Sequence, residues 1–214
     1  MDKSFSEAQA DSHDRSLGLR ERKKRETAER IYRAALKLFR QRGYDATTVE
    51  EIAQAADVAK GTFFNYFPTK DAVLGYLGQR QMHLVYEAIA AKGDFAMLPV
   101  YEQLAFVFDT LAAGIQDERE FVHIVSLEVY RSASAFSDAT GSARQLYELL
   151  VGIVRRGQEH GELRTTALAE SMALIMMATY FYTFFAWLEL ENPPALAIML
   201  HVHLDLLLQG MKFP

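Results

Sequence analysis

The segment Thr47–Leu74, TTVEEIAQAADVAKGTFFNYFPTKDAVL, constrains the fold most, because it confines two short helices and a corner to 28 residues. Thr48 and Glu51 form the capping-box pattern, which predicts that the first short helix begins here. Asp57 stands at the corner, where the chain needs a residue that tolerates a left-handed backbone. The second short helix is predicted over about 60–66. Two short helices joined by a tight corner and preceded by a longer helix are typical of a helix-turn-helix.

Helical periodicity continues through the rest of the chain, without strand-like alternation. The expected fold is therefore all-α with about nine helices: an N-terminal three-helix helix-turn-helix DNA-binding domain, then a C-terminal helical ligand-binding and dimerisation domain. The expected organisation is a disordered tail at 1–18, a DNA-binding domain at 19–74 with its helix-turn-helix at about 47–67, and the helical domain at 75–214. Helices are predicted over about 19–42, 49–56, 60–66, 70–91, 99–116, 118–132, 143–160, 167–191 and 193–209, with a loop at 132–142.

Charge divides the chain in the same way as the helix pattern. The whole chain has a formal net charge of -5, but residues 15–80 carry a net +6 and residues 81–214 a net -8. A basic segment can bind a polyanion, whereas an acidic one repels it. The charge distribution therefore places nucleic-acid binding in the first segment alone.

The first segment resembles the DNA-binding domain of the TetR family of bacterial transcriptional repressors over about residues 24–74. Two departures from the family pattern stand out: Asp57 replaces the usual glycine at the corner, and Phe64 replaces a frequent tyrosine. The matching residues are Ile31, Ala34, Ala35, Leu38, Phe39, Arg42, Gly43, Tyr44, Thr47, Thr48, Val49, Ile52, Ala53, Ala56, Val58, Gly61, Thr62, Tyr66, Phe67 and Lys70.

The resemblance implies a homodimer that inserts the helix at 60–66 into the major groove of a palindromic double-stranded DNA operator. It further implies that Thr48, Tyr66 and Lys70 contact phosphates, Lys70 at the start of the helix at 70–91. Thr48 acts as a helix cap in any case. The alternative for Tyr66 is an aromatic residue that holds the turn.

The resemblance implies that four more residues, all in the helix at 60–66, face the bases. Lys60 is placed to reach guanine O6 and N7, with a solvated lysine as the alternative. Gly61 lets the backbone approach the bases, Thr62 meets a thymine methyl group or a phosphate, and Asn65 meets an adenine edge or a phosphate. The basic run at 20–25 is expected to neutralise phosphates or to enter the minor groove, unless it is simply solvated.

The acidic segment is expected to hold the dimer interface and a pocket for an unidentified small-molecule effector. The apolar stretches at about 167–191 and 193–209 would aggregate if they were left exposed, which favours a partner subunit on them. Met and aromatic side chains suit adaptable apolar sites, although such a stripe also fits a plain core. Glu128 interrupts an apolar stripe, and His123 is either a ligand contact or a core histidine. The predicted ligand-binding residues are Phe106, His123, Glu128, Tyr147, Met176, Tyr180 and Phe184.

Enzyme, metal and membrane functions are not predicted. The sequence has no phosphate loop, nucleophile elbow or H-E-x-x-H motif, and no cysteine, which fits a reducing cytosol. The family resemblance implies a cytoplasmic location in a bacterium. His201 and His203 point to different sides of a helix, so no cofactor or metal is expected. The uncharged run at 171–188 is at the lower limit of a membrane span, but its acidic flanks favour a buried helix. The predicted function is a DNA-binding transcriptional regulator, a repressor released from its operator by an apolar or amphipathic ligand. The alternative is a helical module that binds nucleic acid loosely.

Overall fold

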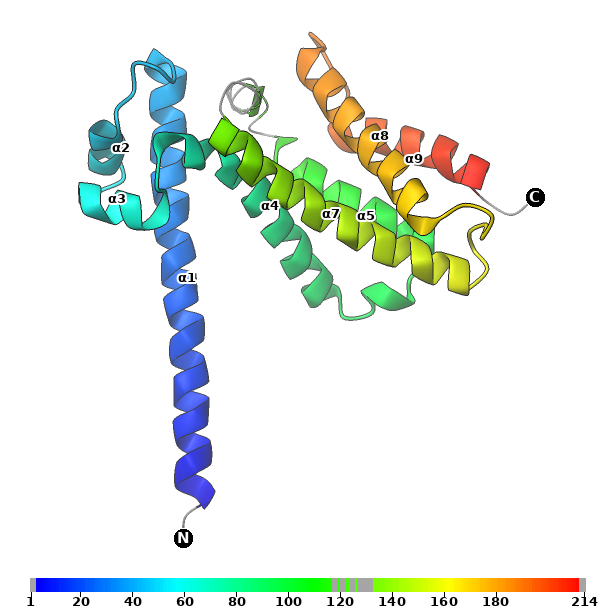
Figure 1. Ribbon diagram of the computed structural model, residues 1–214, viewed down its shortest axis with the longest axis horizontal. Helices are drawn as coiled ribbons and strands as arrows, with labels where there is room; N and C mark the ends of the chain where they lie inside the picture. Colours follow the sequence, from blue (N-terminus) through cyan, green and yellow to red (C-terminus); the bar gives the residue numbers. More distant parts are fainter. Residues whose placement is uncertain (1–2, 117–118, 120–121, 124–125, 127–132, 212–214) are drawn as a thin grey trace. The chain divides into compact units, whose positions relative to one another are not determined.

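Helices account for all the regular structure in the described part of the chain, which comprises residues 3–116, 119, 122, 123, 126 and 133–211 of a computed structural model (Figure 1). The predicted all-α fold is confirmed. The chain divides into two compact units, Met1–Val73 and Leu74–Pro214. The elements are α1 (Lys3–Arg42), α2 (Val49–Ala55), α3 (Lys60–Tyr66), α4 (Lys70–Lys92), the 3-10 helix η1 (Phe95–Met97), α5 (Val100–Ala113), α7 (Ala133–Glu159), α8 (Ala169–Glu189) and α9 (Leu196–Met211).

The first unit is built on the apolar face of α1. Ile31 and Ala35 of this helix are fully buried, and α2 packs against α1 while α3 packs against α2. Ile52 of α2 and Phe63 of α3 are also fully buried. Burying a large apolar side chain contributes about 1.5–3 kcal/mol, so these residues hold the two short helices on α1.

Helix α1 differs from its prediction at its N-terminal end. A disordered tail was expected at 1–18, but α1 begins at Lys3. The physical reason is that helix nucleation costs far more than propagation. The buried stripe at 31–39 nucleates the helix, and residues 3–18 contain no proline that would end it.

The second unit packs α5, α7, α8 and α9 around a shared core. Helix α8 contacts α7 and α9, and α5 contacts the same two helices. Trp187 is fully buried, and its indole Nε1 donates to the Pro194 carbonyl at 3.1 Å, joining the end of α8 to the start of α9. One face of α9 is buried at every fourth residue, at Leu196, Leu200, Leu204 and Leu208.

Two further predictions on this unit have clear outcomes. The predicted loop at 132–142 is wrong, because α7 begins at Ala133. Its serines and Gly141 have modest helix propensity, but propensity is weak compared with tertiary packing, and Ser142 is buried. The predicted end of this helix at Gly161 is confirmed by a positive φ of 74° there. The helix predicted at 118–132 lies largely outside the described residues.

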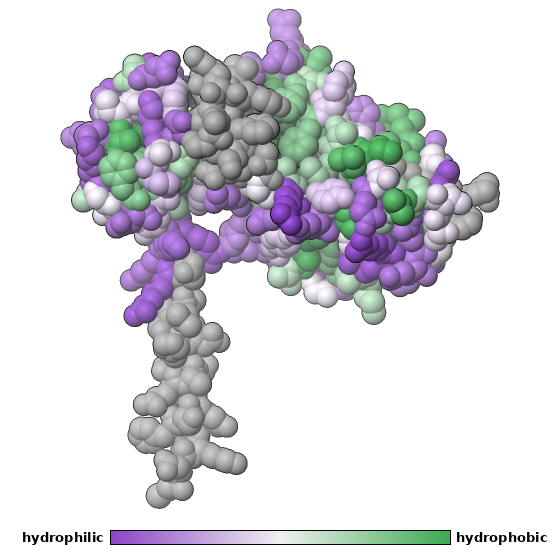
Figure 2. Space-filling model, viewed as in Figure 1, coloured by the Kyte–Doolittle hydropathy of each residue, from purple (hydrophilic) through white to green (hydrophobic). Residues whose placement is uncertain are grey.

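The outer surface of α8 and α9 is apolar. Figure 2 shows apolar side chains gathered over this part of the second unit. By length and composition α8 is the one helix in the described residues that could cross a membrane, a test that core helices of soluble proteins also pass. The large exposed apolar residues on the two helices are Leu174, Ile175, Tyr182, Ile198, Val202 and Leu206.

Candidate nucleic-acid interface

The turn between α2 and α3 is held by backbone hydrogen bonds around Asp57. The Val58 amide donates to the Ala53 carbonyl at 3.0 Å. Asp57 has a φ of 54°, the one positive value for a non-glycine residue in the described chain, which confirms the predicted left-handed corner. Aspartate tolerates this conformation better than most residues, so the tight corner forms without glycine.

The start of α2 is fixed by the predicted capping box, which the structure confirms. The Glu51 amide donates to Thr48 Oγ1 at 3.3 Å, and the Thr48 amide donates to Glu51 Oε2 at 2.9 Å. The hydrogen bonds that the Thr48 amide and the Thr48 hydroxyl donate to the Glu51 carboxylate lower the pKa of that group. Arg42 at the end of α1 adds an ion pair to Glu51 at 2.5 Å, which links α1 to the cap.

Helix α3 presents most of the predicted DNA-contacting residues on its outer face. Lys60, Gly61 and Asn65 are exposed, and Thr62 and Tyr66 are half-buried. Nothing lies within 4 Å of the position that a Cβ of Gly61 would occupy. Internal packing therefore does not require glycine there, and the open space permits a close approach of another molecule.

Phe63 and Phe67 anchor α3 from beneath. Both are buried, and their ring centroids lie 5.8 Å apart. Phe64 is 44% exposed and makes an edge contact with Phe63. Phe63 and Phe67 are core residues, whereas Phe64 adds an apolar surface to the outer face of the helix.

Lys60 is paired with Glu50, a contact that the sequence reasoning missed. The Lys60 ammonium group donates to the Glu50 carboxylate, and more than half of each side chain is exposed. The hydrogen bond from Lys60 lowers the pKa of Glu50, so the carboxylate is charged at neutral pH. No spacing rule signals this pair, because the residues lie ten positions apart on different helices.

Lys70 is used by the fold itself. Its Nζ donates to the carbonyls of Tyr44 at 2.8 Å and Thr47 at 3.0 Å, and it lies 4.1 Å from the centroid of the Tyr44 ring. The Tyr44 hydroxyl donates to Asp71, also in the first turn of α4. Lys70 therefore holds the loop between α1 and α2 on α4. Its phosphate contact stays a prediction, and a phosphate would have to share the Lys70 ammonium group with these backbone carbonyls.

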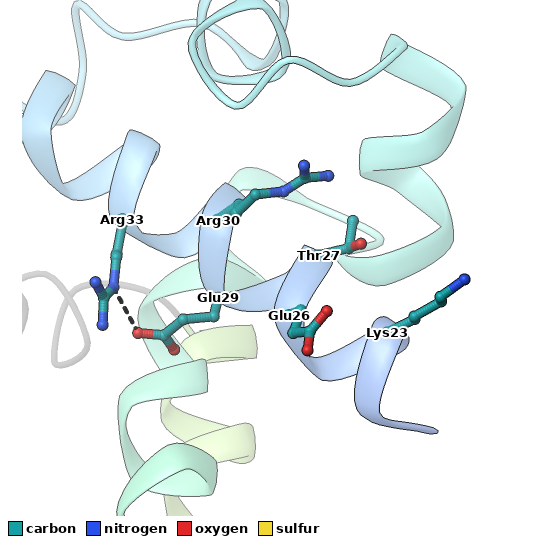
Figure 3. A pocket seen from close by; sticks show the side chains of 6 residues that line it. All are labelled: Lys23, Glu26, Thr27, Glu29, Arg30 and Arg33. Carbon is teal, nitrogen blue, oxygen red and sulfur yellow. Dashed lines mark hydrogen bonds and ion pairs between the residues drawn. The ribbon is translucent and has the colours of Figure 1, made fainter. Parts of the chain in front are cut away.

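The basic run near the start of the unit is helical, and several of its charges are exposed. Figure 3 shows an open hollow along α1, where Lys23 and Arg30 extend toward the same side as Thr27 while Arg33 donates to Glu29 at 2.8 Å. A helix is about 10–12 Å wide, whereas the minor groove of B-DNA is about 6 Å wide. As a helix the run at 20–25 is too wide to lie in the minor groove, so phosphate neutralisation and a simply solvated run are the two interpretations that stay open.

The predicted ligand-binding residues separate into groups. Met176, Tyr180 and Phe184 are buried along one face of α8, and the Tyr180 ring stacks on Phe108 of α5 and on Phe184, with centroids 5.8 and 6.3 Å apart. Burial raises the pKa of the Tyr180 phenol, so it stays neutral. Among the described residues, this stack is the one place where the structure brings predicted ligand-binding residues together.

The other predicted ligand-binding residues lie elsewhere. Phe106 is half-buried against Phe95, with ring centroids 5.7 Å apart, and Tyr147 is half-buried on α7. The interpretation of His123 as a core histidine is wrong, because its side chain is 39% exposed and pairs with Glu189 at 3.0 Å. Glu128 lies outside the described residues.

Candidate metal sites are absent from the described residues. His201 lies 2.9 Å from Asp109, whereas His203 Nδ1 lies 2.6 Å from the Thr183 hydroxyl. The two histidines thus face different helices, as predicted.

The fold and the exposed face of α3 together define a helix-turn-helix protein of the nucleic-acid-binding class. The family model for bacterial regulatory proteins of the tetR family matches residues 31–77. The chain is also similar to the FadR transcriptional repressor of Thermus thermophilus, solved in complex with lauroyl-CoA. That similarity has 34% identity and a TM-score of 0.63, and covers 87% of this chain and 96% of that one. The chain belongs to the tetR family.

Other relatives show how far the similarity reaches. The transcriptional regulator TcmR of Streptomyces glaucescens is 50% identical over 56 residues, which is 26% of this chain and 25% of TcmR. The regulator YuxN of Bacillus subtilis matches over 43% of this chain and 31% of its own length at 34% identity. The chain thus spans less than a third of these two relatives. The FadR regulator of Bacillus subtilis, in complex with stearoyl-CoA, has a TM-score of 0.70 at 21% identity, covering 86% of this chain and 99% of that one, and shows the fold alone.

Proposed function

We propose that this chain is a homodimeric, cytoplasmic transcriptional repressor that binds a palindromic DNA operator and is released from it by an amphipathic small molecule. The observation that carries the proposal is the exposed face of α3, which presents Lys60, Gly61 and Asn65 on a helix held firmly from beneath by Phe63. The segment 15–80, which contains this helix, carries a net charge of +6, and such a basic segment suits DNA binding.

The proposed DNA contacts follow from this face. Lys60 and Asn65 carry the donors and acceptors that read guanine and adenine edges in the major groove. Thr48 and Tyr66 supply hydroxyl groups for phosphates, which set the position of α3 without reading sequence. A dimer would place two copies of α3 about one helical turn of DNA, roughly 34 Å, apart.

The proposed dimer interface is the apolar outer face of α8 and α9. Ile198, Val202 and Leu206 are each more than half exposed and recur at every fourth residue of α9. Monomeric proteins rarely expose a continuous apolar patch of this kind. A second copy with the same face would cover it in a four-helix arrangement with two-fold symmetry.

The proposed effector has a long apolar part and a polar group. This class is supported by the lauroyl-CoA complex of the Thermus thermophilus relative and by the buried aromatic stack of Phe108, Tyr180 and Phe184. Effector binding would stabilise a conformation of the second unit in which the two copies of α3 no longer fit successive major grooves. Such an effector acts only through its different affinity for the two conformations.

The test is fluorescence anisotropy with a labelled duplex from the region upstream of the chain's own gene, at two salt concentrations. A scrambled duplex of the same composition is the control, and lauroyl-CoA is the effector probe. Selective, salt-sensitive binding that lauroyl-CoA weakens is the expected result. Equal binding to both duplexes would favour the loose nucleic-acid-binding module instead, and selective binding that ignores lauroyl-CoA would refute the proposed effector class.

A further inference from the structure

Two buried polar side chains in the second unit are left without hydrogen-bond partners. Gln81 on α4 and Ser142 on α7 are each only 7% exposed. Within the described part of the chain, neither the Oε1 and Nε2 atoms of Gln81 nor Oγ of Ser142 have a partner. A buried polar group without a partner destabilises a fold, and most such groups in proteins are paired.

Glycines hold the two side chains close to the helix backbones. A Cβ on Gly78 would lie 2.9 Å from Ser142 Oγ, and a Cβ on Gly114 would lie 2.6 Å from Gln81 Oε1. Any larger residue at either glycine would therefore displace a polar group. Gly78 and Gln81 are three positions apart on α4 and share one face of it. Ser142, which lies against Gly78, therefore meets α4 within one helical turn of Gln81.

Gln103, another buried glutamine of the second unit, shows the usual arrangement. It is 2% exposed on α5, its Nε2 donates to the Leu98 carbonyl at 2.6 Å, and its Oε1 accepts from Arg156 at 2.9 Å. Both ends of its amide are therefore paired. Gln81 is also buried but has neither bond, so the fold itself does not use its amide.

We propose that Gln81 and Ser142 form a polar subsite for an uncharged carbonyl or hydroxyl group of the effector. This inference rests on the proposed function and deepens it. The Gln81 Nε2 and the Ser142 hydroxyl can each donate to a carbonyl oxygen, and Gln81 Oε1 can accept from a hydroxyl group. Both side chains are neutral, so the subsite selects a neutral group over a carboxylate. The subsite joins α4, the end of α5 and α7, so its occupation fixes these helices relative to one another within the second unit.

The first test needs no ligand. Gln81→Met and Ser142→Ala each remove an unpartnered polar group, and each should raise the melting temperature by about 2–5 °C at fixed protein concentration. The matched control is Gln103→Met, which removes two hydrogen bonds and should lower the melting temperature. If Gln81→Met and Ser142→Ala instead leave it unchanged or lower it, then internal water satisfies the groups and the inference is overturned.

The second test uses two probes that differ by one carbonyl group. Lauroyl-CoA has a thioester carbonyl, and the S-dodecyl thioether of CoA lacks it. Wild-type protein should bind lauroyl-CoA about tenfold more tightly than the thioether in calorimetry, and the two variants should lose this preference. Binding of both probes without preference would overturn the subsite. Binding of neither would refute the acyl-chain effector class of the proposed function, and the melting temperatures of the ligand-free variants would then decide on the subsite by themselves.

Discussion

Replacing Glu50 with glutamine should strengthen DNA binding, because Glu50 holds the ammonium group of Lys60 in the unbound protein. Both residues lie on the surface proposed to meet DNA, at the starts of α2 and α3. The hydrogen bond from Lys60 lowers the pKa of Glu50, so the pair is ionised at neutral pH. DNA must therefore compete with a carboxylate for Lys60, and that carboxylate also repels the phosphates.

The size of the effect follows from counterion release. Releasing Lys60 from Glu50 adds one positive charge at the DNA surface, and one such charge steepens the dependence of log K on log salt concentration by about 0.9, which corresponds to about eightfold tighter binding at 0.1 M salt. Glu50→Gln preserves the shape of the side chain and removes the charge. The expected gain is thus close to eightfold, and it should shrink as the salt concentration rises.

The assay is fluorescence anisotropy at about four salt concentrations between roughly 0.05 and 0.3 M, the range in which phosphate contacts dominate the salt dependence. Glu148→Gln is the matched control, because Glu148, like Glu50, pairs with a basic side chain, that of Arg144 at 2.9 Å, but lies on α7 in the other unit. In the Lys60→Ala background, Glu50→Gln should give a smaller gain than it gives in the wild type, since only the loss of phosphate repulsion remains and the pairwise contribution of Lys60 is gone. Unchanged affinity and salt dependence in Glu50→Gln, or an equal gain in Glu148→Gln, would refute the reasoning.

Five other substitutions test the rest of the structure. Tyr66→Phe should weaken binding to operator and scrambled duplexes about equally, whereas Lys60→Ala should also alter base preference; an unaltered preference would remove Lys60 from base reading. Thr48→Ala should lower the free energy of unfolding in urea by about 1 kcal/mol while Thr48→Ser retains most of it, and equal stabilities would exclude the cap as the cause. Asp57→Val should cost about 1–2 kcal/mol in the same assay, because a β-branched residue disfavours the positive φ, and undiminished stability after this substitution would contradict the left-handed corner. Leu206→Glu should convert the proposed dimer to a monomer in analytical ultracentrifugation, and a dimer that persists in this variant would place the interface elsewhere.

The local features of the helix-turn-helix could be predicted because each depends on residues close together in the chain. The capping box joins Thr48 to Glu51, three positions on, and both of its hydrogen bonds are present. Gly43 has a φ of 85° after the end of α1, and the Ala72 amide donates to Thr69 at 3.1 Å at the start of α4. Such signals act within one helical turn, so the order of residues is enough to specify them.

Helix limits far from such signals were harder to predict. Helix α7 begins at Ala133 in spite of a serine-rich stretch, and α1 extends to Lys3 through polar residues. In both places propensity and composition pointed to irregular structure. Packing at one end of a helix can carry the rest, and this dependence does not appear in a short window of sequence.

The sequence by itself determined that this chain is helical, that residues 49–66 form a helix-turn-helix, and that positive charge is concentrated in the first segment. The tertiary structure alone decided which of those charges and polar groups have partners. Lys70 meets backbone carbonyls 23 and 26 positions away, Lys60 meets Glu50, and Gln81 is buried without a partner. The reason is that capping and periodicity act along the chain, whereas ion pairs and burial depend on which helix faces are brought together in space.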